Sequence, residues 1–176
     1  LTLNRPAKRN AFDEHLAAAL RVAFERLSAR PDVRVVVLAG NGETFCAGGD
    51  LAWMKRAAGW SPEENRADAA AFQAAFEAID RCEKPVVARV HGAALGGGAG
   101  LVAVADVALA AAGTVLGFPE VRLGLVPGVI SPYVVRRLGP ARARRYFLSG
   151  CRFDAAEAVA VGLLDRVVAA ERLDAA

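Results

Sequence analysis

Glycines gather in two stretches of the sequence, TFCAGGDL at residues 44–51 and HGAALGGGAGL at residues 91–101. Each stretch follows an apolar run and precedes a segment with a helical pattern. Each is therefore expected to place unpaired backbone N–H groups and the positive end of a helix at one corner. Such a corner binds negative charge, which is either a phosphate or the oxyanion that develops when a thioester or ester carbonyl is attacked or enolised.

A phosphate would require a dinucleotide-binding fingerprint. Gly98, Gly100 and Ala103 match its pattern G-x-G-x-x-A, and Glu120 follows after about the required twenty residues. The context differs, because the fingerprint turns directly off its strand, whereas the apolar run before Gly98 ends at Val90. Glu120 also lies in a loop-like sequence, F-P-E, and not at a strand end. The chain also has neither a P-loop lysine motif nor a G-x-S-x-G nucleophile elbow. The oxyanion hypothesis uses both glycine stretches together.

Periodic apolar residues predict the elements that hold these loops. A helix is expected over residues 12–27, and Ser61 as N-cap with Pro62 at the first helical position predicts another helix to about Cys82. Residues 33–40 and 84–90 are apolar on both faces, which is typical of buried strands in a parallel sheet. Further strands are expected in residues 1–4, 101–113 (after a helical turn), 114–118 and 163–168. Further helices are expected in residues 51–58, 139–150 and 153–162. The last of these has a capping-box spacing from Asp154 to Glu157 and a stop at Gly162.

Composition limits the class of protein. A chain of 176 residues, 55% apolar and 23% charged, predicts one globular domain over residues 1–176 with its own core. The net charge is +3, and the densest basic patch lacks interleaved aromatic residues, so no nucleic-acid partner is expected. That patch consists of Arg136, Arg137, Arg142, Arg144 and Arg145.

Cysteines and long apolar runs bear on the environment of the protein. Cys46, Cys82 and Cys151 lie far apart without a CxxC motif, and the chain has two histidines, so neither a disulfide framework nor a metal site is expected. This usage favours a reducing, cytoplasmic compartment. The apolar run from Ala93 to Phe118 carries Asp106 near its centre, so it is expected to form buried core and not a membrane span.

Three motifs in order carry a resemblance to a known family. TFCAGGDL, HGAALGGGAGL and FPEVRLGLVPG (residues 118–128) resemble the signature of the enoyl-CoA hydratase/isomerase, or crotonase, superfamily, and the similarity runs from residue 4 to residue 168. The resemblance implies an α/β crotonase-like fold of repeated ββα units. It also implies an acyl-CoA substrate, with coenzyme A as part of that substrate and no separate cofactor.

The resemblance implies roles for particular residues. The backbone N–H groups of Gly49 and Gly97 would bind the thioester oxygen, and Glu120 would move a proton at the carbon alpha or beta to the thioester. An apolar wall of Phe118, Leu123 and Val126 would raise the pKa of Glu120; the alternative for Glu120 is a solvated loop residue. Contacts to the substrate and to coenzyme A are expected from Lys8, Arg9, Ala11, Ala47, Gly48, Asp50, Leu51, Gly96, Gly98, Pro119 and Leu123, with a solvated turn as the alternative for Lys8 and Arg9.

The chain departs from the family pattern at Gly100. Hydratases of this family that use two glutamates carry the second one at this position, and a single carboxylate suits an isomerase or a decarboxylase. Residues 121–158 nevertheless resemble the bacterial methylglutaconyl-CoA hydratase branch of leucine breakdown. We therefore expect hydration of a branched or carboxylated 2-enoyl-CoA. The alternatives are an enoyl-CoA isomerase that uses Glu120 alone, a nucleotide-binding module and a non-catalytic scaffold.

Several other side chains carry smaller expectations. Cys46 is expected to be a small buried residue and His91 a structural one. Trp53 and Trp60 either line the acyl pocket or pack a helix, and Arg136 or Tyr133 is a candidate partner for a second substrate carboxylate. Members of the family are trimers or pairs of trimers with a further C-terminal helical segment. A homotrimer or hexamer is therefore expected. The chain ends at LDAA, where that segment would begin, so the C-terminal helical segment is expected to be incomplete here.

Overall fold

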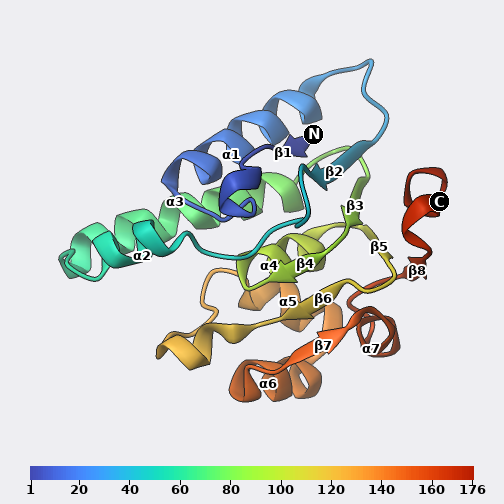
Figure 1. The fold of residues 1–176 in the computed structure, drawn as a ribbon. Coiled ribbons are helices and arrows are strands. Elements are labelled where there is room, and N and C mark those ends of the chain that lie inside the picture. Colours follow the sequence, from blue (N-terminus) through green and yellow to red (C-terminus); the bar gives the residue numbers. More distant parts are fainter.

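The structure, a computed structural model, describes all of residues 1–176, and most of the chain repeats one unit (Figure 1). Each unit has a strand of a large sheet, a short segment that pairs in a second layer, and a helix. The units are β1 (Thr2–Leu3), a bridge at Phe12 and α1 (Glu14–Ala29); β2 (Val36–Gly40), a bridge at Cys46 and α2 (Leu51–Ala57); β3 (Val86–Val90), β4 (Ala93–Leu95) and α4 (Gly97–Val104); and β5 (Val107–Ala111), β6 (Val115–Gly117) and the 3-10 helix η2 (Pro119–Leu123). The expected α/β fold of repeated ββα units is confirmed.

The remaining elements extend these units. Helix α3 (Pro62–Asp80) follows α2, and the two helices α1 and α3 pack side by side (Figure 1). A short 3-10 helix, η1 (Pro6–Lys8), joins β1 to the first bridge. The chain continues from η2 through α5 (Ser131–Leu138), α6 (Pro140–Ser149), β7 (Arg152–Asp154), α7 (Ala155–Val161), β8 (Arg166–Val168) and η3 (Ala170–Ala175).

Two sheets set the position of the loops. The strands of the large sheet are all parallel, in the order β1-β2-β3-β5-β8. The small sheet has the order β4-β6-β7, in which β4 and β6 are parallel and β7 is antiparallel to β6. Parallel strands end at the same edge of a sheet, so the segments after β2, β3 and β5 enter the second layer side by side. The two glycine stretches and Glu120 belong to these three segments.

One face of the large sheet carries the core. Val36, Leu38 and Ala88 are buried and pack in one cluster with Phe24 of α1 and Phe76 of α3. The other face is partly open, since the alternating residues Val35, Val37 and Val107 are 48%, 43% and 39% exposed. The expectation that residues 33–40 form a strand buried on both faces is therefore wrong, because helices cover one side of the strand and not the other.

Local sequence signals placed most helix ends correctly. Ser61 begins α3 with a complete capping box, in which its side chain and that of Glu64 exchange hydrogen bonds with the backbone. Asp154 caps α7 by accepting from the N–H of Glu157 at 2.8 Å, and Gly162 ends that helix in the left-handed region. The carboxylate of Glu157 instead accepts from the hydroxyl of Tyr146 at 2.6 Å, so this capping box is one-sided.

The apolar run from Ala93 to Phe118 is a folded core segment, as expected. It forms β4, α4, β5 and β6, and its helix, α4, has eight residues. Among all the helices, none combines the length and the apolar character that crossing a membrane requires. The sequence analysis missed β4, β7, α5 and the three 3-10 helices, and it expected only a helical turn where α4 lies.

Candidate active site

The two glycine stretches and Glu120 line one cavity of about 410 Å³. They occupy equivalent places in three successive ββα units, where the second-layer segment gives way to the helix. Gly49 directly precedes Asp50, the N-cap of α2; Gly97 is the first residue of α4; and Glu120 is the second residue of η2. The repeat therefore brings three separate helix starts to one point.

The bridge to Phe12 orients the amide of Gly49. The N–H of Phe12 donates to the carbonyl of Gly48 at 2.7 Å, and the N–H of Asp50 donates to the carbonyl of Phe12 at 2.7 Å. Because backbone groups alternate in direction along an extended segment, the N–H of Gly49 points away from Phe12. This N–H donates to no backbone carbonyl of the chain, so it is free to bind a ligand.

Gly97 presents a second free amide. Its N–H also lacks a carbonyl partner, as expected for the first residue of a helix. The preceding residue, Gly96, has a φ of +51°, and its own N–H donates to the carbonyl of Gly117 at 2.9 Å. The N-terminus of α4 thus faces the cavity with an unpaired donor, where the helix dipole favours negative charge.

The three segments approach so closely that only glycine fits at two of their positions. A Cβ on Gly48 would lie 2.9 Å from the carbonyl oxygen of Leu95, and a Cβ on Gly96 would lie 3.0 Å from Oε1 of Glu120. The Cα of Gly48 would be 3.8 Å from that same Cβ on Gly96. The glycines therefore remove side chains where one loop packs on the next and where a ligand would contact the main chain.

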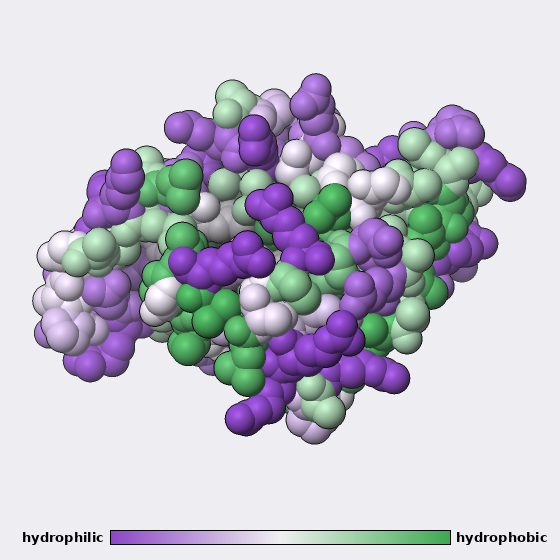
Figure 2. All heavy atoms as spheres, turned by 60° about the horizontal axis from the view of Figure 1, so that its bottom comes forward, coloured by the Kyte–Doolittle hydropathy of each residue, from purple (hydrophilic) through white to green (hydrophobic).

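The carboxyl of Glu120 is largely removed from solvent and from hydrogen-bond partners. Burial raises the pKa of its carboxyl above the ordinary value of 4.5, and its Oε2 atom is buried without a hydrogen-bond partner. A solvated loop glutamate would show neither property. Of the wall expected around it, Phe118 is fully buried, whereas Leu123 and Val126 line the cavity but are 57% and 82% exposed. When the molecule is turned so that the bottom of Figure 1 comes forward, its surface shows a patch of apolar side chains (Figure 2).

An aromatic row forms the floor of the cavity. The ring centroids are 4.8 Å apart between Trp53 and Phe72, and 5.9 Å apart between Phe12 and each of Phe72 and Phe76. Glu120 is the single titratable residue among those that line the cavity. The pocket beside the two amides is therefore apolar apart from one carboxyl, which suits an acyl chain next to an acid or base.

The space beside Gly100 is already filled. A Cβ at this position would overlap the side chain of Ile130 and would lie 3.1 Å from Cε1 of Phe76. A glutamate could not be accommodated there without displacing both neighbours. The absence of a second glutamate is thus matched by the packing around it.

The structure brings most of the predicted contact residues to the cavity, but not all of them. The residues that line it are Ala47, Gly48, Gly49, Leu51, Gly96, Gly97, Pro119, Glu120 and Leu123. Lys8, Arg9, Ala11, Asp50 and Gly98 do not line it. Gly98 is buried, and a Cβ there would overlap the carbonyl of Cys46, so its small size serves packing between the loops.

Asp50 has a structural task that the sequence analysis did not foresee. Its carboxylate caps α2 by accepting from the N–H of Ala52 at 2.8 Å, and this bond is the main reason that its pKa lies below the ordinary value. Arg5 also bonds to it at 3.1 Å and to Asp13, the N-cap of α1, at 2.7 Å. Arg5 therefore ties two helix starts together. An Asp before each helical pattern was the only signal that could have indicated this role.

The turn of Lys8 and Arg9 lies beside the first glycine loop although it does not line the cavity. The carbonyl of Arg9 accepts from the N–H of Ala47 at 3.0 Å. Both basic side chains belong to exposed residues and have no ion-pair partner within the chain. A phosphate that emerges from the cavity near Ala47 would meet them, so the contact to coenzyme A stays a prediction.

The structure also places the other side chains for which the sequence analysis gave expectations. Cys46 is fully buried, and burial raises the pKa of its thiol to about 12, which confirms a small core residue and not a nucleophile. His91 bonds through Nε2 to the carbonyl of Gly42 at 2.8 Å, which fits its expected structural role. Tyr133 and Arg136 lie outside the cavity, and Arg136 pairs with Asp80. Trp53 lines the cavity, but Trp60 does not.

The structure gives a further reason against the dinucleotide alternative. The strand β3 ends at Val90 as expected, but a short strand that the sequence analysis missed, β4, follows it and ends at Leu95, close to the glycines. Gly98 and Gly100, however, are buried against Cys46 and Ile130 and cannot cradle a pyrophosphate. Glu120 follows β6 inside η2, where a ribose would not lie.

Comparison with known proteins agrees with this geometry. The model of the family described as enoyl-CoA hydratase/isomerase matches residues 1–176. The chain belongs to this family. It is 35% identical over 175 residues to crotonyl-CoA hydratase of Syntrophomonas wolfei, covering 98% of the chain and 66% of that protein. It is 38% identical over 165 residues to an enoyl-CoA hydratase homologue of Thermus thermophilus, covering 94% of the chain and 65% of that protein.

Solved structures contain the fold of this chain. An enoyl-CoA hydratase from Shewanella pealeana superposes with a TM-score of 0.95 at 38% identity, over 99% of this chain and 65% of that one. AtuE from Pseudomonas aeruginosa has a TM-score of 0.95 at 42% identity, over 99% of this chain and 68% of that one. The chain thus spans about two thirds of the length of these relatives.

Proposed function

We propose that this chain is the core of an enoyl-CoA hydratase, a lyase that adds water to a 2-enoyl-CoA thioester. The observation that carries the proposal is the convergence of two unpartnered amides, those of Gly49 and Gly97, on the same cavity as the buried carboxyl of Glu120. The names of the relatives support the same reaction.

In the proposed reaction, the amides of Gly49 and Gly97 donate to the thioester oxygen. Donors of this kind are worth about 2.7–4 kcal/mol each, because they bind the enolate more tightly than the ground-state carbonyl. The carboxylate of Glu120 takes a proton from water while the water oxygen bonds to the β-carbon, and the electron pair of the double bond moves to the thioester oxygen. Glu120 then returns that proton to the α-carbon, so water is added and the carboxylate is restored.

Burial of Glu120 suits this exchange. A raised pKa brings a carboxyl closer to the pH at which it must both accept and return a proton. The carboxyl faces no basic residue in the cavity, so no ion pair holds it in the charged form. Its environment therefore favours proton transfer over permanent ionisation.

The finer parts of the proposal rest on the sequence resemblance. Methylglutaconyl-CoA, an intermediate of leucine breakdown, is the proposed substrate because residues 121–158 resemble the corresponding branch. Lys8 and Arg9 are the proposed partners of the coenzyme A phosphates. A homotrimer or a pair of trimers in the cytoplasm is the proposed state of the whole protein.

The packing beside Gly100 favours a second candidate, an enoyl-CoA isomerase. Ile130 and Phe76 fill the position of a second carboxyl, so Glu120 is the single proton carrier in the cavity. Glu120 would take a proton from the α-carbon of a 3-enoyl-CoA and return it to the γ-carbon. The same two amides would hold the dienolate oxygen between these steps.

Absorbance of the conjugated 2-enoyl thioester distinguishes the candidates. The whole protein is incubated with crotonyl-CoA, methylglutaconyl-CoA and a 3-enoyl-CoA in turn. Hydration lowers the absorbance with either of the first two, and isomerisation raises it with the third. Glu120→Gln should lower kcat by about 10²–10⁴-fold. The absence of turnover with all three substrates would refute the proposal, and an unaffected Glu120→Gln variant would refute the role of this residue.

A further inference from the structure

The indole of Trp53 forms a wall of the cavity right beside the first amide donor. Its Cζ3 atom lies 3.5 Å from the position that a Cβ on Gly49 would occupy, and its ring packs on Phe72 at a centroid distance of 4.8 Å. Trp53 therefore lies next to the place where the acyl chain leaves the thioester. A movement of this ring would change the width of the cavity at that point.

A carboxylate on another helix holds this indole. Nε1 of Trp53 in α2 donates to Oδ1 of Asp68 in α3 at 3.3 Å. Helix α2 has seven residues, and this bond ties the ring to the longer helix α3, on whose Phe72 it also packs. Removal of the acceptor would leave a partly buried indole N–H without a partner, which costs free energy and favours another ring position.

Burial and neighbouring charges affect the carboxyl of Asp68 that accepts this hydrogen bond. Burial raises its pKa, the bond from Trp53 lowers it, and the charge of Glu14 in α1 raises it further. Glu14 in turn pairs with Arg56 of α2 at 2.7 Å, and its Oε2 atom is buried without a partner. The carboxylate of Asp68 forms no ion pair, and its side-chain hydrogen bond is the one from the indole N–H of Trp53.

We infer that Asp68 is a positioning residue that fixes the Trp53 indole as a wall of the acyl pocket and thereby sets which acyl chains the site accepts. This inference rests on the proposed acyl-CoA function. Asp68 does not line the cavity, so it acts through Trp53 and not by contact with the substrate.

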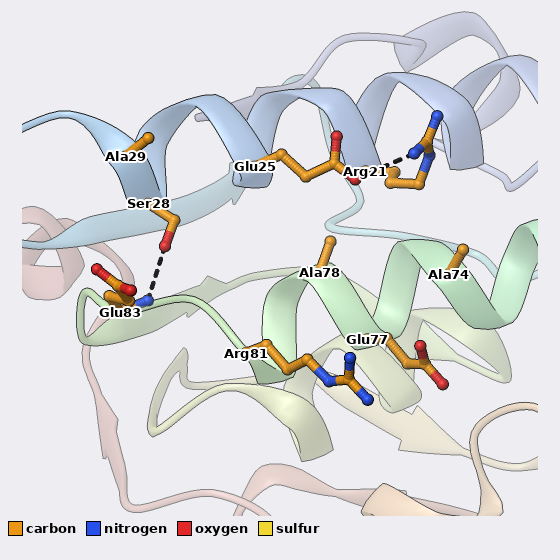
Figure 3. A pocket seen from close by; sticks show the side chains of 9 residues that line it. All are labelled: Arg21, Glu25, Ser28, Ala29, Ala74, Glu77, Ala78, Arg81 and Glu83. Carbon is orange, nitrogen blue, oxygen red and sulfur yellow. Dashed lines mark hydrogen bonds and ion pairs between the residues drawn. The ribbon is translucent and has the colours of Figure 1, made fainter.

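The test uses Asp68→Ala, with Asp68→Asn as the conservative variant that keeps an oxygen acceptor. The matched control is Glu77→Ala on the same helix. Glu77 lies in the groove between α1 and α3 (Figure 3), together with Arg21, Glu25 and Arg81, and does not line the acyl cavity. A first readout is the emission of Trp53 from residues 1–176 in a Trp60→Phe background, in which Trp53 is the one tryptophan of these residues, and it does not depend on turnover.

The expected result has two parts. Asp68→Ala should shift the Trp53 emission and raise its quenching by acrylamide, whereas Asp68→Asn and Glu77→Ala should not. Asp68→Ala should also raise the KM for crotonyl-CoA, by at most about five- to tenfold because the free energy of one hydrogen bond limits the effect, with kcat changed less than about twofold. The KM for a ten-carbon 2-enoyl-CoA should rise less, because a longer chain still contacts the rest of the aromatic floor.

Each contrary result is decisive. An emission spectrum that is the same in Asp68→Ala and Glu77→Ala would refute the positioning of Trp53. A changed emission with an unchanged ratio of the two KM values would refute the control of acyl-chain choice. Absence of turnover in the unmodified protein would instead refute the proposed function, and the emission would still decide whether Asp68 positions the indole.

Discussion

Oε1 of Glu120 lies 3.0 Å from the position that a Cβ on Gly96 would occupy. Gly96, the N-cap of α4, therefore leaves just enough room for the carboxyl of Glu120 in η2, and any side chain at position 96 would push that carboxyl aside. Gly96 also has a φ of +51°, a backbone conformation that residues other than glycine rarely adopt. The glycine loop thus supplies an amide donor and, at the neighbouring residue, the space for the acid or base.

Gly96→Ala should lower kcat by about ten- to a hundredfold, because a small displacement of Glu120 removes its alignment with the reacting carbons. The matched control is Gly113→Ala, since Gly113 has a φ of +83° but no heavy atom near its Cβ position. The control should lose about 1–2 kcal/mol of stability from the left-handed conformation alone and keep its kcat. Equal kcat values for the two variants would contradict the link between Gly96 and Glu120.

The pH profile of kcat/KM should report the raised pKa of Glu120. Burial raises this pKa, so the active carboxylate is lost as the pH falls through a value above 4.5. Because no other titratable residue lines the cavity, the profile should have one acid limb from the enzyme. Initial rates of hydration across this range would locate the limb. An acid limb of the kcat/KM profile at or below pH 4.5 would show that burial does not raise the pKa of Glu120.

Glu120→Gln should increase the free energy of unfolding at neutral pH. The folded pKa is raised above the unfolded value of 4.5, so the fold disfavours the charged form, and this penalty is complete above the folded pKa and absent below the unfolded one. The gain from the neutral side chain should therefore shrink as the pH falls towards 4.5.

Urea unfolding at several pH values measures this gain. Glu43→Gln, at an exposed loop residue, is the control and should change stability little. A gain in the free energy of unfolding of Glu120→Gln that is the same at all pH values would show that burial does not destabilise the charged carboxylate.

Gly97→Pro should remove one donor to the thioester oxygen and keep the helix. Proline lacks the N–H and is well tolerated at the first position of a helix, where Gly97 lies. The expected loss in kcat is about 10²–10³-fold. Gly97→Ala keeps the N–H and serves as the steric control, since either new side chain meets the ring of Phe12 at about 3.1 Å. Similar losses of kcat in the two variants would mean that the added side chain disturbs packing, and that loss of the N–H donor is not the cause.

Much of the fold could be predicted because local patterns coincide with the repeated unit. The periodic helix α1, the capping box at Ser61 and the apolar strands β2 and β3 carry strong signals. The short strands β4 and β7 have three residues each and no pattern of their own. They exist because β6 pairs with both of them, which is a relationship between distant segments.

The site was predictable to the same degree. Glycines before helical segments predict unpaired amides in the two loops, and the sequence resemblance pointed to Gly49, Gly97 and Glu120 in particular. What the sequence could not reveal are the contacts across elements. Arg5 joins the caps of two helices, and Asp68 bonds the indole of Trp53 across α2 and α3. Such pairs have no fixed spacing in the sequence.

The most direct test of the central claim is the infrared carbonyl stretch of bound butyryl-CoA labelled with ¹³C at the thioester carbon, a saturated ligand that cannot be hydrated. Two amide donors should polarise the carbonyl and lower its stretching frequency in the unmodified protein relative to water. The shift should be clearly smaller in Gly97→Pro and nearly intact in Gly97→Ala. An unshifted carbonyl in the unmodified protein, or one shifted equally in both variants, would contradict the account.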